Sequence, residues 1–431
     1  MPGPQDPACE DEARDRQSTS MNVDASRLTR ELDTLAAISE ATAPTVTRIV
    51  FTDADLRARD YVKSLCANAG LVVREDAVGN TFARWTGTMP DLPPVGTGSH
   101  IDAIPNAGKY DGTVGVLGGL EAIRALRASG FTPSRSIDLI VFTSEEPTRF
   151  GIGCLGSRLL AGALDESAGA RLKDRDGRSL EDVRTTAGFS GSLSSVRLAQ
   201  GAYSAFVELH IEQGPILEQR NIDLGLVTAI AAPAGLEITI EGEGGHAGAV
   251  LMPDRRDAFL AAAEIALAIE AAAYATGSID TVATVGVCEV FPGAVNSVPS
   301  RTRLEVDVRD IDGARRDGVL DMIAASCDEA ARRRSVRIER RTVNADPPAQ
   351  CAPEIVDILA TASESRGFTH QRMISRAYHD SLFMSRVAPT AMLFIPCRGG
   401  ISHRPDEYAS PESIARGATV LADALARLSV H

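Results

Sequence analysis

The chain has 431 residues, of which 44% are hydrophobic and 24% are charged, and its formal net charge is −14. This length exceeds what one ordinary core accommodates and predicts two domains, and the composition is typical of a globular protein. The negative charge argues against nucleic acids and membranes as partners and leaves a small molecule as the expected ligand.

Residues 1–22 are polar, charged and rich in proline, which predicts a disordered tail and not a signal peptide. The seven cysteines are scattered and no pair has CxxC spacing, so the pattern indicates reduced thiols and a cytoplasmic location. The longest apolar helix candidate, residues 258–273, contains Glu264 and Glu270 and is too short to cross a bilayer.

From about residue 95 onward, predicted strands alternate with predicted helices, which indicates an α/β fold with a mixed sheet. A first helix is expected over residues 113–129, and the strands run over residues 94–99, 136–143, 204–209 and 390–395. Short polar islands follow these strands. Because ligands bind at the carboxyl edge of an open α/β sheet, we expect the islands to meet there.

Two stretches rich in alanine and proline, residues 229–234 and 344–352, interrupt this alternation. Between them the pattern predicts, in chain order, a strand, a helix, two strands and a helix, over residues 236–241, 257–275, 281–289, 303–309 and 313–333. We therefore expect a catalytic domain in two parts, residues 23–230 and 347–431, and a smaller α+β domain inserted at residues 231–346.

Three histidines and two carboxylates from separate islands could hold two metal ions: His100, Asp111, Glu146, His210 and His403. Each ion needs about three protein groups, one of them shared. His100, Asp111 and His210 would bind the first ion, and Asp111, Glu146 and His403 the second. A bridging Asp111 sets the ions about 3.5–4 Å apart, with room for a water between them. This donor set lacks a thiolate and suits manganese and zinc about equally.

Two further acidic residues could support the ligands. If Glu146 faces an ion, its neighbour Glu145 can take a proton from the water between the ions as general base. An isolated acidic pair after a strand more often forms a solvated turn, but the joint pattern of the islands favours a site. Asp102 lies two residues after His100 and is expected to orient its imidazole.

Three polar residues of the inserted domain could contact a substrate. His246 stands in the glycine-rich segment 242–257 and could polarise a carbonyl, although a turn with an incidental histidine is the alternative. Asn296 precedes Ser-Val-Pro, and Arg309 ends a predicted strand. Both could bind a carboxylate, Arg309 in a bidentate manner, unless Arg309 forms a structural ion pair.

Three other motifs lack the context that they need. Residues 151–156 match GxGxxG, but a charged segment separates them from the preceding strand, so a dinucleotide site is not expected. His379-Asp380-Ser381 resembles part of a catalytic triad but has no nucleophile elbow. Cys397 fits a small buried hydrophobe better than a nucleophile.

Several motifs together carry a resemblance that runs from about residue 30 to the C-terminus: GSHID, GKYDG, TSEEPTRFG, HIEQGPILE, GGHAGA and GGISHRP. In this order they resemble the dinuclear-metal amidohydrolases, which include allantoate amidohydrolases and N-carbamoyl-L-amino-acid hydrolases and are related to aminoacylases. Within the group, AGAVLMP, RDIDGARR and MISRAYHDSLFMSR are most similar to the ureidoglycolate amidohydrolase branch. Ile401 departs from that branch, whose plant members carry aromatic residues in this segment.

The resemblance implies hydrolysis of the ureido C–N bond of (S)-ureidoglycolate to glyoxylate, ammonia and carbon dioxide, a step of purine catabolism. It implies two divalent metal ions, which the ureidoglycolate branch tips toward manganese with zinc as the alternative. It also implies a homodimer in which the inserted domain is lid and interface, and in which His246 reaches the partner's active site. The expected substrate-binding residues are Gln213, Asn296, Arg309 and His379.

Other functions fit the same motifs less well. Allantoate and N-carbamoyl amino acids are the nearest alternative substrates, because they would use the same site. An inactive metal-binding relative is a second alternative, against which the presence of Glu145 beside all five ligands argues. An exopeptidase is a third alternative, which the ureido-type segments HIEQGP and MISRAYHD disfavour.

Overall fold

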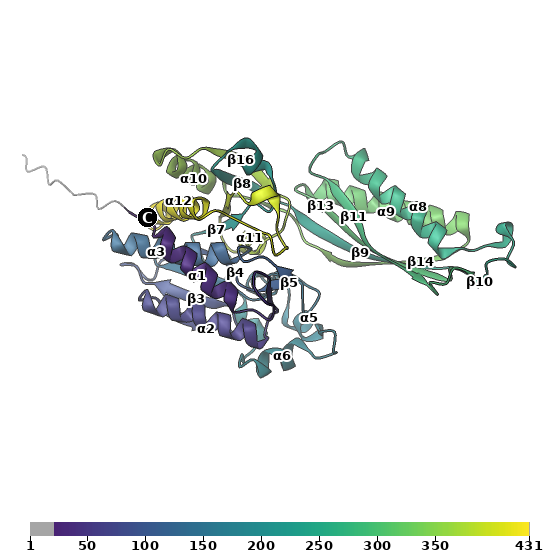
Figure 1. Cartoon of the computed structure of the whole chain (residues 1–431), viewed down its shortest axis with the longest axis horizontal. Coiled ribbons are helices and arrows are strands. Elements are labelled where there is room, and N and C mark those ends of the chain that lie inside the picture. The colour runs from purple at the N-terminus through teal and green to yellow at the C-terminus, as the bar shows by residue number, and fades with distance from the viewer. Residues whose placement is uncertain (1–20, 431) are drawn as a thin grey trace, which may run out of the picture.

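The computed structural model describes residues 21–430, which form a larger body around a central sheet and a smaller body beside it (Figure 1). Of the tail predicted at residues 1–22, only Met21 and Asn22 lie within the described residues. The first part of the larger body contains α1 (Ala25–Ala37), β1 (Val46–Arg48), α2 (Asp53–Asn68), β2 (Val72–Glu75), β3 (Thr81–Trp85), β4 (Val95–His100), β5 (Ala103–Ala107), α3 (Thr113–Ala128), β6 (Ile137–Phe142), α4 (Leu155–Leu160), α5 (Glu166–Arg171), α6 (Leu180–Thr186), η1 (Leu193–Val196), β7 (Ala205–Ile211), α7 (Ile216–Arg220) and β8 (Leu224–Ile230).

The chain leaves the larger body after β8 and returns to it at β15. The smaller body contains β9 (Ala232–Glu241), β10 (Gly245–His246), η2 (Met252–Asp254), α8 (Ala258–Ala275), β11 (Val282–Phe291), β12 (Ser297–Val298), β13 (Arg301–Asp310), α9 (Gly313–Arg334) and β14 (Arg337–Ala345). The larger body is completed by β15 (Ala349–Gln350), α10 (Pro353–Ser365), β16 (His370–Ser375), α11 (Asp380–Met384), β17 (Thr390–Ile395), η3 (Arg398–Gly400) and α12 (Pro411–Leu428).

The central sheet has the strand order β15-β8-β17-β7-β4-β6-β3-β2, with β16 paired to β8. Its middle strands β17, β7, β4 and β6 are parallel, and the antiparallel strands β8 and β3 flank them. The predicted α/β class with a mixed sheet is therefore confirmed.

Helices cover both faces of this sheet, which explains why its middle strands are hydrophobic without interruption. In β6 all six residues are buried. Ile137, Leu139 and Val141 join the core under α1, α2, α3, α10 and α12, whereas Ile140 and Phe142 join the core under α4, α6 and α11. This three-layer packing fixes the strand ends at which the polar islands lie.

The carboxyl ends of the parallel strands gather the candidate ligands at one edge of the sheet. His100 is the last residue of β4, and Thr97 pairs with Val207, which brings His100 level with His210 in β7. Glu145 and Glu146 follow β6. Register in the parallel sheet thus brings together residues that are 110 positions apart in the chain.

The smaller body is a four-stranded antiparallel sheet, β11-β13-β9-β14, with α8 and α9 packed on one face. In β13 the residues Leu304, Val306 and Val308 alternate into the core, and the residues between them lie on the face that carries no helix. By length and composition α8 is apolar enough to cross a membrane. Its Ala258, Ile265 and Ile269 belong instead to the core between the helices and this sheet.

The alanine- and proline-rich stretch at residues 229–234 lies where the chain enters the smaller body, and the strand predicted at residues 236–241 begins within this stretch, at Ala232. Pro233 lies in β9, opposite Arg309 of β13. The other neighbour of β9, strand β14, ends its pairing at Ala345 opposite Ala234, so no neighbour there requires the missing N–H of Pro233.

Candidate active site

The donor atoms of the five candidate ligands converge on the two oxygens of Asp111. Asp111 Oδ1 lies 3.2 Å from His210 Nε2 and 3.6 Å from His100 Nε2. Asp111 Oδ2 lies 3.2 Å from His403 Nε2, and this imidazole nitrogen lies 3.3 Å from Glu146 Oε1. The side chain of Asp111 therefore faces both predicted ligand trios, one with each oxygen.

This arrangement fits two metal ions. The atoms of each trio lie within 4.8 Å of one another. Ligand atoms bound to one ion at about 2.0–2.2 Å are separated by roughly 3–3.5 Å, close to the observed spacing. His210 Nδ1 bonds the carbonyl of Ile211 at 2.9 Å, which makes Nε2 the ring nitrogen that can bind an ion. His100, Asp111 and His210 could hold one ion, and Asp111, Glu146 and His403 another.

Gly112 makes room for this cluster. Its φ of +65° lies in the left-handed region, and a Cβ at this position would stand 2.5 Å from the imidazole of His100. Its backbone nitrogen lies 3.2 Å from His210 Nε2. The residue after Asp111 must therefore be glycine, as the GKYDG motif has it.

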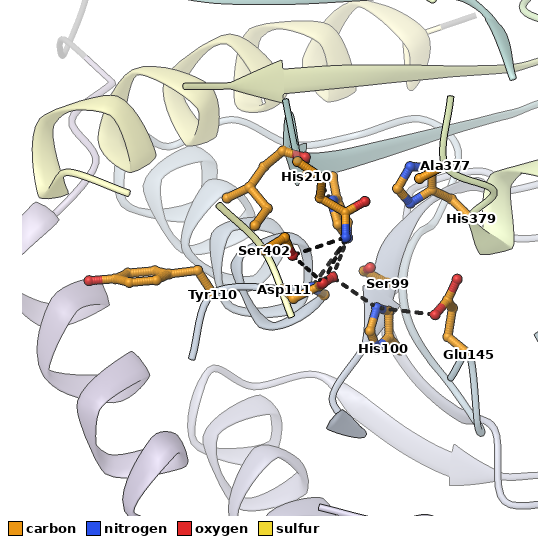
Figure 2. Close-up of polar contacts among 12 residues, drawn as sticks. Ser99, His100, Tyr110, Asp111, Glu145, His210, Ala377, His379 and Ser402 are labelled. Atoms are coloured by element: carbon orange, nitrogen blue, oxygen red, sulfur yellow. Dashed lines mark hydrogen bonds and ion pairs between the residues drawn. The ribbon is translucent and has the colours of Figure 1, made fainter. Parts of the chain in front are cut away.

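Glu145 points to the same cluster without belonging to either trio (Figure 2). Its Oε2 lies 3.7 Å from His100 Nε2, and its Oε1 accepts a hydrogen bond from the thiol of Cys154 at 3.6 Å. Burial raises the pKa of Glu145 well above its usual range, and the charge of Glu146 adds to the effect. A buried carboxylate with a raised pKa beside a metal cluster is suited to take up and return a proton.

Asp102 has a wider role than the predicted orientation of His100. His100 Nδ1 is 3.1 Å from the backbone carbonyl of Asp102 and 3.5 Å from its carboxylate. The two carboxylate oxygens accept hydrogen bonds from the backbone nitrogens of Glu145 and Glu146, at 3.2 and 3.1 Å. Asp102 therefore fixes the turn that presents both glutamates.

Carboxylates raise the pKa of the clustered imidazoles. Hydrogen bonds to Asp111 and Glu146 raise the pKa of His403 to about 11. For His100, burial opposes protonation, but Glu145, Asp102 and Asp111 still raise the pKa well above its usual range. Without a metal these imidazoles hold protons at neutral pH, and a metal ion must displace them.

Metal binding at neutral pH is therefore expected to release protons, because His100 and His403 must bind as neutral imidazoles. Affinity should rise with pH, since protons and metal ions compete for the same nitrogens. Titration of Mn²⁺ into metal-free protein by calorimetry, in buffers of different ionisation enthalpy, measures the release. Heats that do not depend on the buffer would contradict this interpretation.

His379 lies beside the ligand cluster and is almost completely buried. Its ring is 4.5 Å from that of His210, its Nε2 bonds Ser375 Oγ at 3.0 Å, and 2% of the residue is exposed. Burial and the neighbouring His210 hold its pKa well below the usual range. The nearby Glu208 could form a third group with His210 and His379, but its two oxygens already accept hydrogen bonds from Ser99 and Ser381.

Arg309 of the smaller body reaches the larger body. Its Nη1 donates to the carbonyl of Arg376 at 3.3 Å, and its guanidinium lies 5.9 Å from the ring of Tyr378. Asp307, on the same face of β13, accepts from Arg309 Nε at 2.7 Å and from Nη2 at 3.3 Å. The ion pair that the sequence left as an alternative is thus present, and it leaves part of the guanidinium free.

His246 and Asn296 lie far from Arg309 within one chain. β10 pairs with β12 so that His246 stands opposite Ser297, and the Asn296 carbonyl accepts from Ala247. Both residues are exposed at the outer tip of the smaller body (Figure 1). About 26 Å of strand β13 separates Arg301 at this end from Arg309. The expectation that Asn296 and Arg309 bind one carboxylate is therefore not met by a single chain.

Comparison with known proteins agrees with this geometry. The profile of peptidase family M20/M25/M40 matches residues 96–427. The chain belongs to this family.

Several relatives of the chain in this family are named hydrolases or amidohydrolases. The chain is 54% identical over 420 residues to ureidoglycolate hydrolase of Arabidopsis thaliana, covering 96% of the chain and 88% of that enzyme. It is 37% identical over 400 residues to N-carbamoyl-L-amino acid amidohydrolase of Geobacillus stearothermophilus, covering 93% and 97%. Structures of AtUAH with (S)-hydroxyglycine and with glyoxylate both superpose with a TM-score of 0.88 at 54% identity, covering 96% of the chain and 99% of AtUAH.

Membership of the M20 family confirms the resemblance drawn from the motifs and the expectation of a hydrolase. Motif reasoning missed four residues that contact the cluster or its supports: Cys154, Tyr378, Ser402 and Glu407. Ser402 and Glu407 lie within four residues of His403, so that proximity was the one signal available in the sequence.

Proposed function

We propose that the chain is a metal-dependent amidohydrolase that cleaves the ureido C–N bond of (S)-ureidoglycolate. The observation that carries the proposal is the 54% identity, along nearly the whole chain, to a ureidoglycolate hydrolase. Structures of AtUAH with glyoxylate and (S)-hydroxyglycine fit the chemistry. Loss of the carbamoyl group from ureidoglycolate leaves hydroxyglycine, which breaks down to glyoxylate and ammonia.

The site residues divide this reaction between them. When bound, two divalent ions would polarise the ureido carbonyl and lower the pKa of a water molecule. Glu145 takes the proton of this attacking water and returns it to the ammonia that leaves. Asp102 holds Glu145 in position through its backbone nitrogen. The remaining carbamate loses carbon dioxide, so one ureidoglycolate and one water yield glyoxylate, carbon dioxide and two ammonia molecules.

Arg309 would bind the substrate carboxylate with the part of its guanidinium that Asp307 leaves free. Gln213 would assist, because its Oε1 is buried and has no hydrogen-bond partner among the described residues. His379, which packs on the ring of His210, would line the site beside it. These three assignments fit a small substrate that carries a carboxylate.

Replacement of Arg309 by lysine is expected to raise KM for ureidoglycolate about 10–100-fold with a smaller change in kcat, because lysine cannot bind a carboxylate in the bidentate manner. Steady-state kinetics measures both constants. Arg303→Lys is the matched control, since Arg303 lies on the same face of β13 but pairs with Glu289 and Glu305. Equal effects of the two replacements would contradict the role of Arg309.

A homodimer is part of the proposal. Ten of the fourteen exposed large hydrophobic residues among residues 21–430 lie in the smaller body: Leu251, Met252, Phe259, Leu267, Tyr274, Ile279, Val282, Val295, Met322 and Val343. Strand β11 is also an unpaired edge of its sheet. A second copy covering this region would bring its exposed His246 and Asn296 to the active site of the first. The smaller body would then act as both lid and interface.

The proposal extends to the metal and to the location. The histidine and carboxylate donors suit manganese and zinc about equally. The similarity to ureidoglycolate hydrolases favours manganese, with zinc as the alternative. The six cysteines of the described residues are free thiols, which supports a reducing, cytoplasmic location. The net charge of −14 supports a chain that has neither a nucleic acid nor a membrane as partner.

Relative rates on three substrates test the function. Ammonia release from (S)-ureidoglycolate, allantoate and an N-carbamoyl-L-amino acid would be compared in Mn²⁺ and in Zn²⁺. We expect ureidoglycolate to give the highest kcat/KM. A higher value for allantoate would assign the chain to the alternative substrate, and no turnover of any of the three would favour a non-catalytic relative.

A further inference from the structure

One buried carboxylate beside the metal cluster belongs to neither ligand trio. Glu407 lies between His403 and α12, and 5% of the residue is exposed. Its Oε1 accepts hydrogen bonds from the backbone nitrogens of Tyr110 and Asp111, at 2.8 and 3.1 Å. Its Oε2 lies 2.9 Å from the hydroxyl of Ser402. Both oxygens accept hydrogen bonds, and Glu407 belongs to no candidate ligand group among the described residues.

The same residues are tied to the side chain of the bridging aspartate. Ser402 Oγ lies 2.8 Å from Asp111 Oδ2, and Figure 2 shows Ser402 directed at Asp111. Gln213 Nε2 donates to Asp111 Oδ2 at 2.7 Å and to Ser402 Oγ at 3.2 Å. Glu407 thus connects the backbone of Asp111 with a hydroxyl that contacts the carboxylate of Asp111.

These contacts join two segments that no strand pairing holds together. His403 lies on a loop after β17, its side chain is 47% exposed, and its φ is +58°. A non-glycine residue in the left-handed region persists only where the surroundings hold it there. Ser402 and Glu407 stand on either side of His403 and anchor this loop to the segment of Asp111. Gly108 completes the fit, since a Cβ there would collide with Glu407.

We propose that Glu407 is a positioning residue that fixes His403 and Asp111 relative to each other and so creates the site for the second ion. The proposal rests on the metal centre of the proposed function but not on its substrate. His100 and His210 are held by their strands, so the first trio depends less on Glu407. Loss of Glu407 should therefore weaken the second ion more than the first.

Calorimetric titration of metal-free protein with Mn²⁺ tests this proposal without an activity measurement. The unmodified protein should bind two ions, and Glu407→Ala should lose about 10–100-fold in affinity for one of them, as is usual when a residue that supports a ligand is removed. The resulting isotherm should resemble that of His403→Ala, which lacks a ligand of the second ion only. Equal weakening of both ions, or of neither, would overturn the proposal.

Two conservative variants separate position from charge. In Glu407→Gln the amide oxygen can still accept from Tyr110 and Asp111, so second-ion affinity should stay within a few-fold of the unmodified protein. Glu407→Asp keeps the charge but is one methylene too short and should bind the second ion poorly. If Glu407→Asp bound the second ion more tightly than Glu407→Gln, the charge of Glu407 and not its position would matter, and the proposal would be overturned. These two variants decide the question if the alanine variant does not fold. Glu412→Ala, an exposed acid at the start of α12, is the matched control.

Discussion

Replacement of Glu145 by glutamine is expected to lower kcat for ureidoglycolate by about 10²–10⁴-fold, the usual contribution of a general base. Binding of two metal ions should stay within a few-fold of the unmodified protein, because Glu145 belongs to neither ligand trio. Glutamine has nearly the same shape and keeps the backbone contact with Asp102, so the turn that presents Glu146 is preserved.

Kinetics and metal titration on the same sample distinguish loss of a general base from loss of a metal ligand. Glu146→Gln is the matched control, because it removes a ligand of the second ion and should reduce metal binding. Near-normal turnover by Glu145→Gln would contradict its assignment as the base. Loss of a metal ion from this variant would show that Glu145 is a ligand.

Two inactive variants are expected to restore activity when they share a dimer. His246 is exposed at the outer tip of the smaller body, about 26 Å of strand away from Arg309 in its own chain. If His246 serves the partner's site, His246→Ala and Glu145→Gln are each inactive as homodimers. In a mixed dimer, one of the two sites has an intact Glu145 and receives an intact His246.

An equal mixture that exchanges subunits should therefore recover about a quarter of the activity of the unmodified protein, since half of the dimers are mixed and each has one complete site. Ammonia release before and after subunit exchange measures the recovery. The control mixes His246→Ala with a chain that carries both His246→Ala and Glu145→Gln. No dimer in this mixture has a complete site. Absence of recovery, with mixed dimers verified by mass, would place His246 in its own chain's site or outside catalysis.

The sequence located the ligand cluster because parallel strands end at one edge, and residues after such strands converge. His100, His210 and the two glutamates could be predicted from this rule alone. The sequence also predicted that Asp111 belongs to both trios, and one of its oxygens indeed faces His210 while the other faces His403.

Contacts between loops distant in sequence could not be predicted in the same way. Glu407 bonds backbone nitrogens almost 300 positions away, and no periodic pattern reports such a contact. Asp102 was expected to orient the imidazole of His100, yet its carboxylate also accepts hydrogen bonds from the turn after β6, which contains Glu145 and Glu146. Asn296 and Arg309 were expected together because each suits a carboxylate, but the length of β13 separates them.

Two strands, β14 and β16, also could not be predicted from the hydrophobic pattern. β14 and β16 carry mixed polar residues because they are exposed or half-buried, and exposure removes the hydrophobic signal on which strand prediction depends. The strand predicted at residues 236–241 begins earlier, at Ala232, and only the pairing of its neighbours shows that this strand tolerates Pro233.

Cleavage of the ureido C–N bond by this site is the central claim, and isotopic labelling tests it most directly. (S)-Ureidoglycolate labelled with ¹³C at the ureido carbon would be followed by NMR together with ammonia and glyoxylate. The account predicts that the label appears in carbon dioxide and bicarbonate, with two ammonia molecules released for each glyoxylate. Label recovered in urea, with no ammonia, would show that the bond to the glyoxylate carbon is broken instead and would contradict the account.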